Sequence, residues 1–346
     1  MTSSATALPD PVDDLAAAVG RAAHGDVAAL TPVLRGGNSR VFRAELTDGR
    51  QLAVKRYPEE PDFQPDRMTI ENAALAFLCV CGAERWVPEP VAASADDRFA
   101  LFHWIDGEPV APLDPAARRD GDAERLLAFL DMLHRLRHRP EAKALPPARE
   151  ACSDVGDVVA QIRERRHRLA TVSKQHPPLA EFLGAFADVA EQVEVPSQKR
   201  GDVAAAAPEH LTLSPSDFGY HNAIRRPDGS FAFVDFDYFG WDDPVKLTAD
   251  TLWHPAMVLS DGERRILANG MADLYGDDPG YAARLAVYMP LLGLKWCLIM
   301  LNEFLPERRD RRAFAHGDAD PDVIRDHQLA KAVAQLDAVQ QLREAA

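Results

Sequence analysis

Alternating apolar and charged positions mark the first third of the chain as β-rich. Across residues 42–46, apolar side chains alternate with Arg43 and Glu45, which is the period of a half-buried strand. The dipeptide Asp48-Gly49 then gives a hairpin turn signal, and the apolar run at residues 51–57 follows it. The pattern therefore predicts two strands joined by a tight turn.

Helical periodicity begins at residues 67–80, where Ile70, Ala74 and Phe77 recur on one face. An earlier short helix is expected at residues 11–24, after an Ala-, Asp- and Ser-rich tail. Further apolar stripes and runs predict helices at residues 126–136, 155–170, 179–193 and 285–305.

An apolar strand at residues 98–105 separates the β-rich part from the helical part and exits into Asp106-Gly107. The pattern predicts an α+β chain with a tail and short helix at 1–27, a β-rich lobe at 28–105 and a helical lobe at 106–346. The strand end lies at the expected hinge between the lobes.

Three oxygen-bearing side chains flank a predicted hairpin in the second half of the chain. Asp217 precedes Asn222 by five positions, and Asp235 closes an apolar run after the turn signal at residues 226–230. Phosphoryl transfer needs a carboxylate that receives a hydroxyl proton and hard oxygen ligands for magnesium. Asp217 is the candidate base, and Asn222 and Asp235 are candidate metal ligands. The alternative is an ordinary surface hairpin.

Lys55 lies in an apolar-flanked strand, where an unpaired ammonium would be costly. Glu71 falls beside the apolar face of the helix at 67–80 and is available as its partner. A strand lysine paired with a helix glutamate is how kinases hold the α- and β-phosphates of a nucleotide. The alternative is a lysine with its head in solvent and a surface glutamate.

Two backbone segments could bind the rest of a nucleotide. Gly36, Gly37, Asn38 and Ser39 form the expected tip of the first hairpin, where glycines allow close approach and free amides could cover phosphate oxygens. The alternative, more frequent for a Gly-Gly pair between strands, is that they form only a turn. At the hinge, the backbone of His103, Trp104 and Ile105 could bond an adenine edge, with the Trp104 side chain serving as packing.

Composition narrows the classes of partner. With 346 residues and 47% hydrophobic content the chain can bury a sizeable core. Its net charge of −15 argues against nucleic acid and is compatible with a cationic small substrate. The apolar run at 285–305 contains Pro290, Lys295, Asn302 and Glu303, so a buried helix is expected rather than a membrane span. Four cysteines without metal-ligand spacing and the lack of a secretory signal pattern predict a cytoplasmic protein.

In order and approximate spacing, these motifs resemble the aminoglycoside phosphotransferase family of small-molecule kinases. The resemblance covers residues 30–305, and the segment from Asp235 to Asp237 also resembles choline-kinase-like relatives. It implies a two-lobed, protein-kinase-like α+β fold with the active site in the cleft. The implied cofactors are ATP or GTP and Mg²⁺.

Carried onto this chain, the resemblance places Gly36 to Ser39 over the phosphates and Lys55, oriented by Glu71, on the α- and β-phosphates. The implied acceptor is a hydroxyl of an aminoglycoside, amino sugar, sugar or amino-alcohol. The alternative is a non-catalytic, nucleotide-binding regulator of the same fold. No Ala-Pro-Glu motif closes an activation segment after Asp235, which argues against protein substrates. The sequence makes no prediction of oligomeric state.

The chain departs from the family where Pro215-Ser216 replaces the usual His-Gly before the base, which removes a histidine that braces the loop. His221 is expected to take a bracing role, and His254 to pack behind the loop. Asp243 and Asp250 are expected to be structural. Candidate substrate-wall residues are Tyr220, His221, Tyr238, Trp241, His254 and Trp296, with Glu303 available for an amine.

Overall fold

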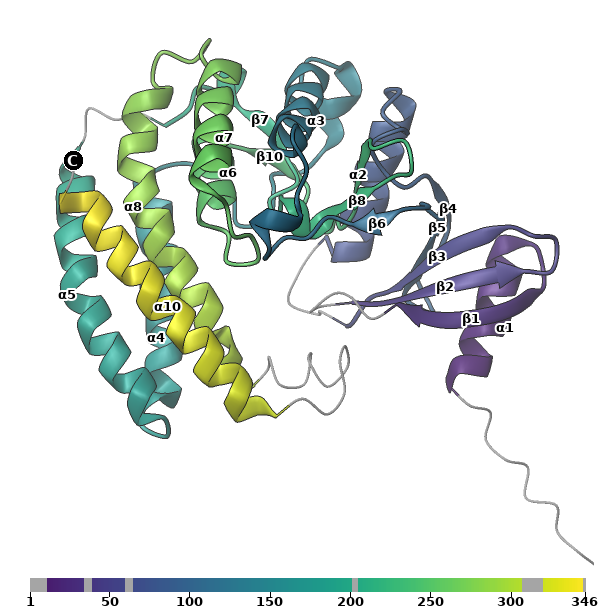
Figure 1. Cartoon of the computed structure of the whole chain (residues 1–346), viewed down its shortest axis with the longest axis horizontal. Coiled ribbons are helices and arrows are strands. Elements are labelled where there is room, and N and C mark those ends of the chain that lie inside the picture. Colours follow the sequence, from purple (N-terminus) through teal and green to yellow (C-terminus); the bar gives the residue numbers. More distant parts are fainter. Residues whose placement is uncertain (1–10, 34–38, 60–64, 201–204, 307–319, 345–346) are drawn as a thin grey trace, which may run out of the picture.

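The protein has a small lobe built on an antiparallel sheet and a larger, mostly helical lobe (Figure 1). This α+β, two-lobed architecture is the one that the sequence predicted. The computed structural model describes residues 11–33, 39–59, 65–200, 205–306 and 320–344.

Five strands form the sheet of the small lobe in the order β1-β2-β3-β5-β4, and every neighbouring pair is antiparallel. Their bounds are β1 (Val27–Val33), β2 (Arg40–Leu46), β3 (Gln51–Arg56), β4 (Pro90–Ser94) and β5 (Phe99–His103). The predicted hairpin at Asp48-Gly49 joins β2 to β3. The tip between β1 and β2, with Gly36, Gly37 and Asn38, lies outside the described residues.

Alternation along β3 decides where its lysine points. Leu52 and Val54 are fully buried against α1 (Pro11–Ala23). Because successive side chains of a strand point to opposite faces, Lys55 points away from α1, towards α2 (Arg67–Val80). Only 7% of Lys55 is exposed, so the ammonium needs a partner inside the protein.

The helix that supplies this partner has the bounds that its periodicity predicted. Asp66 caps α2 by accepting a hydrogen bond from the Thr69 amide. Ile70 and Ala74 bury the helix against the sheet and the neighbouring lobe. Glu71, beside this apolar face, is only 2% exposed and is therefore held in the interior.

The chain crosses between the lobes at Gly107, close to the backbone of another strand. A Cβ atom on Gly107, whose φ is +155°, would lie 2.3 Å from the carbonyl oxygen of Arg225, so the crossing requires glycine. β6 (Glu108–Pro109) follows and joins β8 (Ala223–Arg225) and β9 (Phe231–Phe233) in a small sheet. The domain boundary at residue 105 stays a prediction.

The larger lobe packs helices around two short sheets. Its α-helices are α3 (Asp122–Leu136), α4 (Val155–Ser173), α5 (Pro177–Lys199), α6 (Pro244–Trp253), α7 (Asp261–Leu274), α8 (Tyr281–Met300) and α10 (Pro321–Glu344). Its remaining strands are β7 (Thr212–Ser214) and β10 (Gly240–Asp242). The 3₁₀ helices are η1 (Pro115–Ala117), η2 (Pro140–Ala144), η3 (Pro208–His210), η4 (Tyr220–Asn222) and η5 (Leu301–Phe304).

Helix α8 is the centre of this lobe. It packs against α4, α6 and α10, and α10 crosses it obliquely in Figure 1. Within the described chain, Tyr281–Phe304 is the one helical stretch long and apolar enough to cross a membrane. Of its most apolar 18 residues, 61% are buried in the protein. The polar Lys295 is buried by pairing with Glu150 and Gln161. The expectation of a buried helix here is confirmed.

Candidate active site

The hairpin predicted around residues 226–230 is present and brings two loops together. β8 and β9 pair antiparallel, and the Val234 amide donates to the Asn222 carbonyl at 2.9 Å. Asn222 ends η4 immediately before β8, and Asp235 follows β9. The two candidate metal ligands therefore lie at the same end of the hairpin, as the sequence predicted.

Lys55 joins the small lobe to this end of the hairpin. Its Nζ donates to Glu71 Oε2 at 2.6 Å and to Asp235 Oδ1 at 2.5 Å. Glu71 also accepts from the Tyr57 hydroxyl at 2.6 Å and from the Phe236 amide at 3.1 Å. One carboxylate thus fixes the lysine, the strand that carries it and the residue after Asp235.

Opposing effects set the protonation of this cluster. Burial by itself would lower the pKa of Lys55, but attraction to Asp235 and Glu71 outweighs it and holds the pKa above its ordinary value. Burial and the neighbouring Asp235 charge raise the pKa of Asp237 to about 8. Lys55, and Arg67 at 3.5 Å, partly offset that rise in the pKa of Asp237. The ammonium of Lys55 is therefore a permanent positive charge in the cleft.

The donor set at the hairpin end suits a hard divalent cation. The Asn222 side-chain amide donates to the Asp217 carbonyl at 3.0 Å, which directs its Nδ2 to the protein and leaves its Oδ1 as an available oxygen. Asp235 adds a carboxylate that is 35% exposed. Its backbone has φ of +71°, in the left-handed region that Asp tolerates better than most residues. Carboxylate and amide oxygens are what magnesium prefers.

Asp217 is held by two histidines. His221 Nε2 lies 2.7 Å and His254 Nε2 lies 3.0 Å from the same oxygen, Asp217 Oδ1. Burial alone would raise the pKa of Asp217, but the interactions with His221 and the hydrogen bond from His254 outweigh it and lower the pKa well below its ordinary value. The side chain is still 30% exposed. Asp217 is therefore an ionised carboxylate with one side open.

These groups line one cleft between the lobes, with a volume of about 510 Å³, the size of a small-molecule site. Its lining includes the candidate residues Ser39, Lys55, Glu71, His103, Trp104, Ile105, Asp217, His221, Asn222 and Asp235. The spatial convergence that the sequence predicted is present for all of these. Gly36, Gly37 and Asn38 lie outside the described residues.

The backbone amides of the hinge are not equivalent. His103 donates to the Glu89 carbonyl at 2.9 Å, and Trp104 donates to the Gln51 carbonyl at 3.2 Å. No acceptor for the Ile105 amide is found within the described part of the chain. The Arg43 guanidinium lies 5.1 Å from the centre of the Trp104 ring, in keeping with the packing role expected for that side chain. Ile105 is thus the hinge residue with a free donor.

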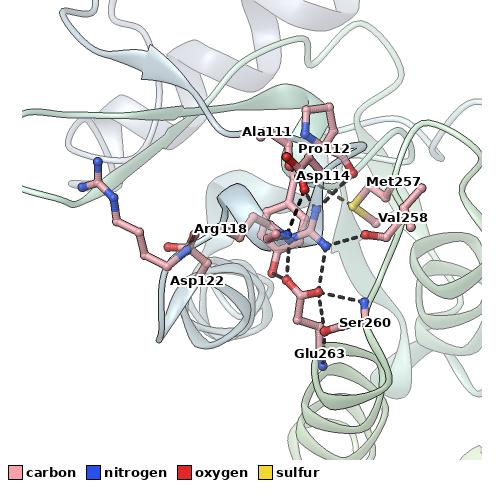
Figure 2. Close-up of polar contacts among 12 residues, drawn as sticks. Ala111, Pro112, Asp114, Arg118, Asp122, Met257, Val258, Ser260 and Glu263 are labelled. Carbon is pink, nitrogen blue, oxygen red and sulfur yellow. Dashed lines mark hydrogen bonds and ion pairs between the residues drawn. The ribbon is translucent and has the colours of Figure 1, made fainter.

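A largely buried ion pair between Arg118 and Glu263 supports the loop that follows Asp217 (Figure 2). Figure 2 shows the Arg118 guanidinium between Pro112, Val258 and Glu263, to which it donates. Glu263 also accepts from the Tyr220 hydroxyl at 3.1 Å. The ion pair therefore links the start of α7 and the segment after β6 to the loop between Asp217 and Asn222.

This ion pair should make the protein's stability depend on pH. Burial would raise the pKa of Glu263, but hydrogen bonds from Arg118 and Ser260 outweigh it and lower the pKa to about 2, from 4.5. A depressed carboxyl pKa stabilises the folded state above the unfolded-state value, and that contribution is lost as pH falls through the folded-state value. We expect Glu263→Gln to lower the free energy of unfolding near neutral pH, with the difference from wild type shrinking as pH falls from about 5 to about 2.

Urea unfolding of both proteins across that pH range measures the difference. Glu181→Gln, at an exposed position on α5, is the matched control and should follow wild type throughout. A destabilisation by Glu263→Gln that stays constant with pH would contradict the assigned ionisation.

The structure changes the roles that the sequence predicted for Tyr220 and His254. Tyr220 is fully buried against Arg118, with the guanidinium 4.6 Å from its ring centre, so it cannot form a substrate wall. His254 was expected to pack behind the loop or to form part of the substrate wall, yet it contacts the carboxylate of Asp217 directly. No sequence signal joins His254 to Asp217, because the contact depends on how the intervening chain, with α6, is packed in the tertiary structure.

Most of the other residues that the sequence placed near the site have interaction partners inside the protein. Asp243 and Asp250 are buried and paired with Arg284 and Lys246, so their expected structural role is confirmed. Indole nitrogens of the two candidate wall tryptophans also have internal acceptors: Trp241 donates to the Ala142 carbonyl and Trp296 donates to Asp250. Tyr238 is flanked by Arg67 and Arg149, each 5.0 Å from its ring centre.

Comparisons with known proteins bear on the activity. Residues 29–287 match the sequence profile described as "Phosphotransferase enzyme family". A search of curated protein sequences finds no match.

Solved structures share the fold. A choline/ethanolamine kinase family protein from Mesorhizobium loti is 18% identical, with 95% of this chain and 99% of that chain covered and a TM-score of 0.62. Choline kinase LicA from Streptococcus pneumoniae is 14% identical, with 94% and 99% covered and a TM-score of 0.59. A spectinomycin phosphotransferase, solved with ADP and spectinomycin, is 12% identical, with 94% and 99% covered and a TM-score of 0.60. At these identities the likeness shows the kinase-like fold alone.

Proposed function

The chain belongs to the phosphotransferase enzyme family, and we propose that it transfers the γ-phosphate of ATP to a hydroxyl group of a small molecule. The observation that carries this proposal is the convergence of Lys55, Asp235 and Asp217 on one cleft. A permanent cation, a metal-binding carboxylate and an ionised base are the parts that phosphoryl transfer requires.

Each charged group has a role in the proposed reaction. Lys55, held by Glu71, would bind the α- and β-phosphates. Asp235 and the side-chain oxygen of Asn222 would hold a divalent cation, which we propose is Mg²⁺. The cation would neutralise charge on the phosphates. Ser39, which lines the cleft, would lie near the phosphates. The hinge would bind the adenine of the nucleotide. The Ile105 amide would donate a hydrogen bond to the adenine edge, and the Trp104 side chain would serve as packing.

The transfer itself needs one proton acceptor on the protein. As the acceptor's hydroxyl oxygen forms its bond to the γ-phosphorus, the bond from that phosphorus to the β–γ bridging oxygen breaks. Asp217 accepts the hydroxyl proton, and ADP leaves with the bridging oxygen. Most of the rate enhancement would come from positioning and from charges fixed before the reaction.

The acceptor is proposed to be cationic. The net charge of −15 favours approach of a positively charged molecule over a polyanion. The structural neighbours include proteins named for choline, ethanolamine, spectinomycin and gentamicin. These compounds, together with amino sugars and neutral sugars, define an acceptor panel. We also propose ATP in preference to GTP, and the cytoplasm as the location.

The test is a coupled assay of ADP release by the full chain with Mg²⁺, supplied with ATP or GTP and each acceptor in turn. Turnover that depends on one acceptor, with a phosphorylated product of that acceptor detected by mass spectrometry, supports the proposal. Omission of the divalent cation is the negative control.

The alternative is a non-catalytic, nucleotide-binding regulator with the same fold. It predicts that the non-hydrolysable analogue AMP-PNP binds in calorimetry while no acceptor in the panel stimulates ADP release. That result would exclude the proposed transfer for the panel's chemical classes and favour the regulator.

A further inference from the structure

The loop that carries Asp217 is braced by His221, as expected, and also by His254, which follows α6. At the two positions directly before the base, where the family that this chain resembles has His-Gly, this protein has Pro215-Ser216 and therefore no histidine. We propose that His221 and His254 are paired positioning residues that orient Asp217 for the incoming hydroxyl. This inference rests on the proposed function, in which Asp217 is the base.

Both histidines act on one oxygen of the carboxylate. Their Nε2 atoms lie 2.7 and 3.0 Å from Asp217 Oδ1, and the two rings stack with centres 4.2 Å apart and an interplanar angle of 8°. No hydrogen bond from the described part of the chain reaches Oδ2, and the carboxylate lines the cleft. Two donors on Oδ1 thus hold the carboxylate against rotation and leave Oδ2 to receive the hydroxyl proton.

The protonation of the His254 ring follows from its other hydrogen bond. Its Nδ1 accepts from the Ala256 amide at 3.2 Å, so Nδ1 carries no proton. A neutral imidazole with an unprotonated Nδ1 has its proton on Nε2, which then donates to Asp217. Burial, followed by the nearby His221, lowers the pKa of His254, in agreement with a neutral ring. The edge contact with Trp296, with ring centres 4.5 Å apart, fixes its plane.

The same three side chains have the composition of a transition-metal site, since their candidate ligand atoms lie within 4.8 Å of one another. Metal binding at His254 Nε2 would require the proton on Nδ1, where it would face the Ala256 N–H. Two donors would then oppose each other in a buried position. The Ala256 contact therefore favours a hydrogen-bonding brace over a metal site.

The segment that carries His254 also shapes the rest of the loop. Met257 Sδ accepts from the Tyr220 amide at 3.1 Å. A Cβ atom on Gly219, whose φ is +158°, would lie 2.2 Å from that sulfur and 3.1 Å from His221 Nδ1. Residues 254–258 therefore hold the loop at both the base and the following turn, which replaces the brace that Pro215-Ser216 cannot supply.

A spectroscopic experiment detects the hydrogen bond between His254 and Asp217 and needs no phosphate-accepting substrate. Nitrogen-15 NMR of the histidine rings is recorded on the full chain, and the variants His254→Gln and His221→Gln assign the signals. We expect the Nε2–H tautomer at His254. Its hydrogen-bonded Nε2 proton should shift upfield in Asp217→Ala, which removes the acceptor. An Nδ1–H tautomer, an Nε2 proton indifferent to Asp217→Ala, or a stoichiometric change of both rings on adding Zn²⁺ alone would overturn the proposal.

Kinetics then measure what the brace does. With Mg²⁺·ATP and the acceptor that gives Asp217-dependent turnover, His254→Leu should lower kcat by about 10- to 100-fold, because a displaced reacting group loses this much, while KM for ATP changes by less than about twofold. His254→Gln keeps an N–H donor near the Nε2 position and should recover most of kcat. Exposed His327 on α10 gives the control variant His327→Leu, which should match wild type.

The outcomes separate the two proposals. A purely structural role predicts that His254→Gln loses as much kcat as His254→Leu, together with a lower melting temperature in both, and that result would overturn the positioning role. If wild type transfers phosphate to no acceptor, the proposed function fails, while the NMR tautomer and its response to Asp217→Ala still decide whether the brace exists.

Discussion

Asp217→Asn is expected to lower kcat for phosphate transfer by about 10²- to 10⁴-fold, the contribution of a positioned general base. The substitution is isosteric, and the asparagine Oδ1 can still accept hydrogen bonds from His221 and His254. Its amide nitrogen would then face the cleft where Oδ2 stood, and an amide cannot accept the hydroxyl proton. The loop should therefore keep its conformation while kcat falls.

The measurement is initial-rate kinetics with Mg²⁺·ATP and the identified acceptor, accompanied by calorimetric titration with AMP-PNP. Nucleotide affinity should change by less than about threefold, because Asp217 is proposed to contact the acceptor and not the phosphates. Asp188→Asn, at an exposed position on α5, is the matched control. If Asp217→Asn retained kcat within about fivefold, Asp217 could not be the base.

Lys55→Met is expected to impair both catalysis and stability. Removing a fixed positive charge from a phosphate site costs about 10²- to 10³-fold in rate. The same change leaves Glu71, which is 2% exposed, and Asp235 without their shared cation. We expect a loss of about 3 kcal/mol in the free energy of unfolding, the lower end for breaking a buried ion pair, since Asp235 is partly exposed.

Urea unfolding and steady-state kinetics on the same preparation test the two effects together. Lys174→Met, exposed at the end of α4, should change neither. Because Glu71 also accepts from Tyr57 and Phe236, its orientation should persist. Wild-type stability in Lys55→Met would mean that solvent compensates both carboxylates, and wild-type kcat/KM for ATP would remove Lys55 from the phosphate site.

Several elements could be predicted from local pattern. The bounds Arg67–Val80 were predicted correctly because the apolar positions of this helix recur with helical period. The hairpin of β8 and β9 followed from a turn signal between apolar runs. By contrast, α10 escaped prediction, since it buries little more than Ala332, Leu336 and Val339 and its stripe is narrow. Helices α6 and α7 were likewise not delimited.

By itself, the sequence determined the β-rich and helical parts, the pairing candidates Lys55 and Glu71, and the oxygen donors Asp217, Asn222 and Asp235, because each is tied to a local period or a motif. The two-lobed, kinase-like fold followed from the family resemblance. Only the tertiary structure decided that the Ile105 amide has no acceptor among the described residues, that Tyr220 packs against Arg118, and that His254 reaches Asp217. Those contacts join segments far apart in the chain, and a contact between distant segments depends on how helices pack, which no local pattern of residues records.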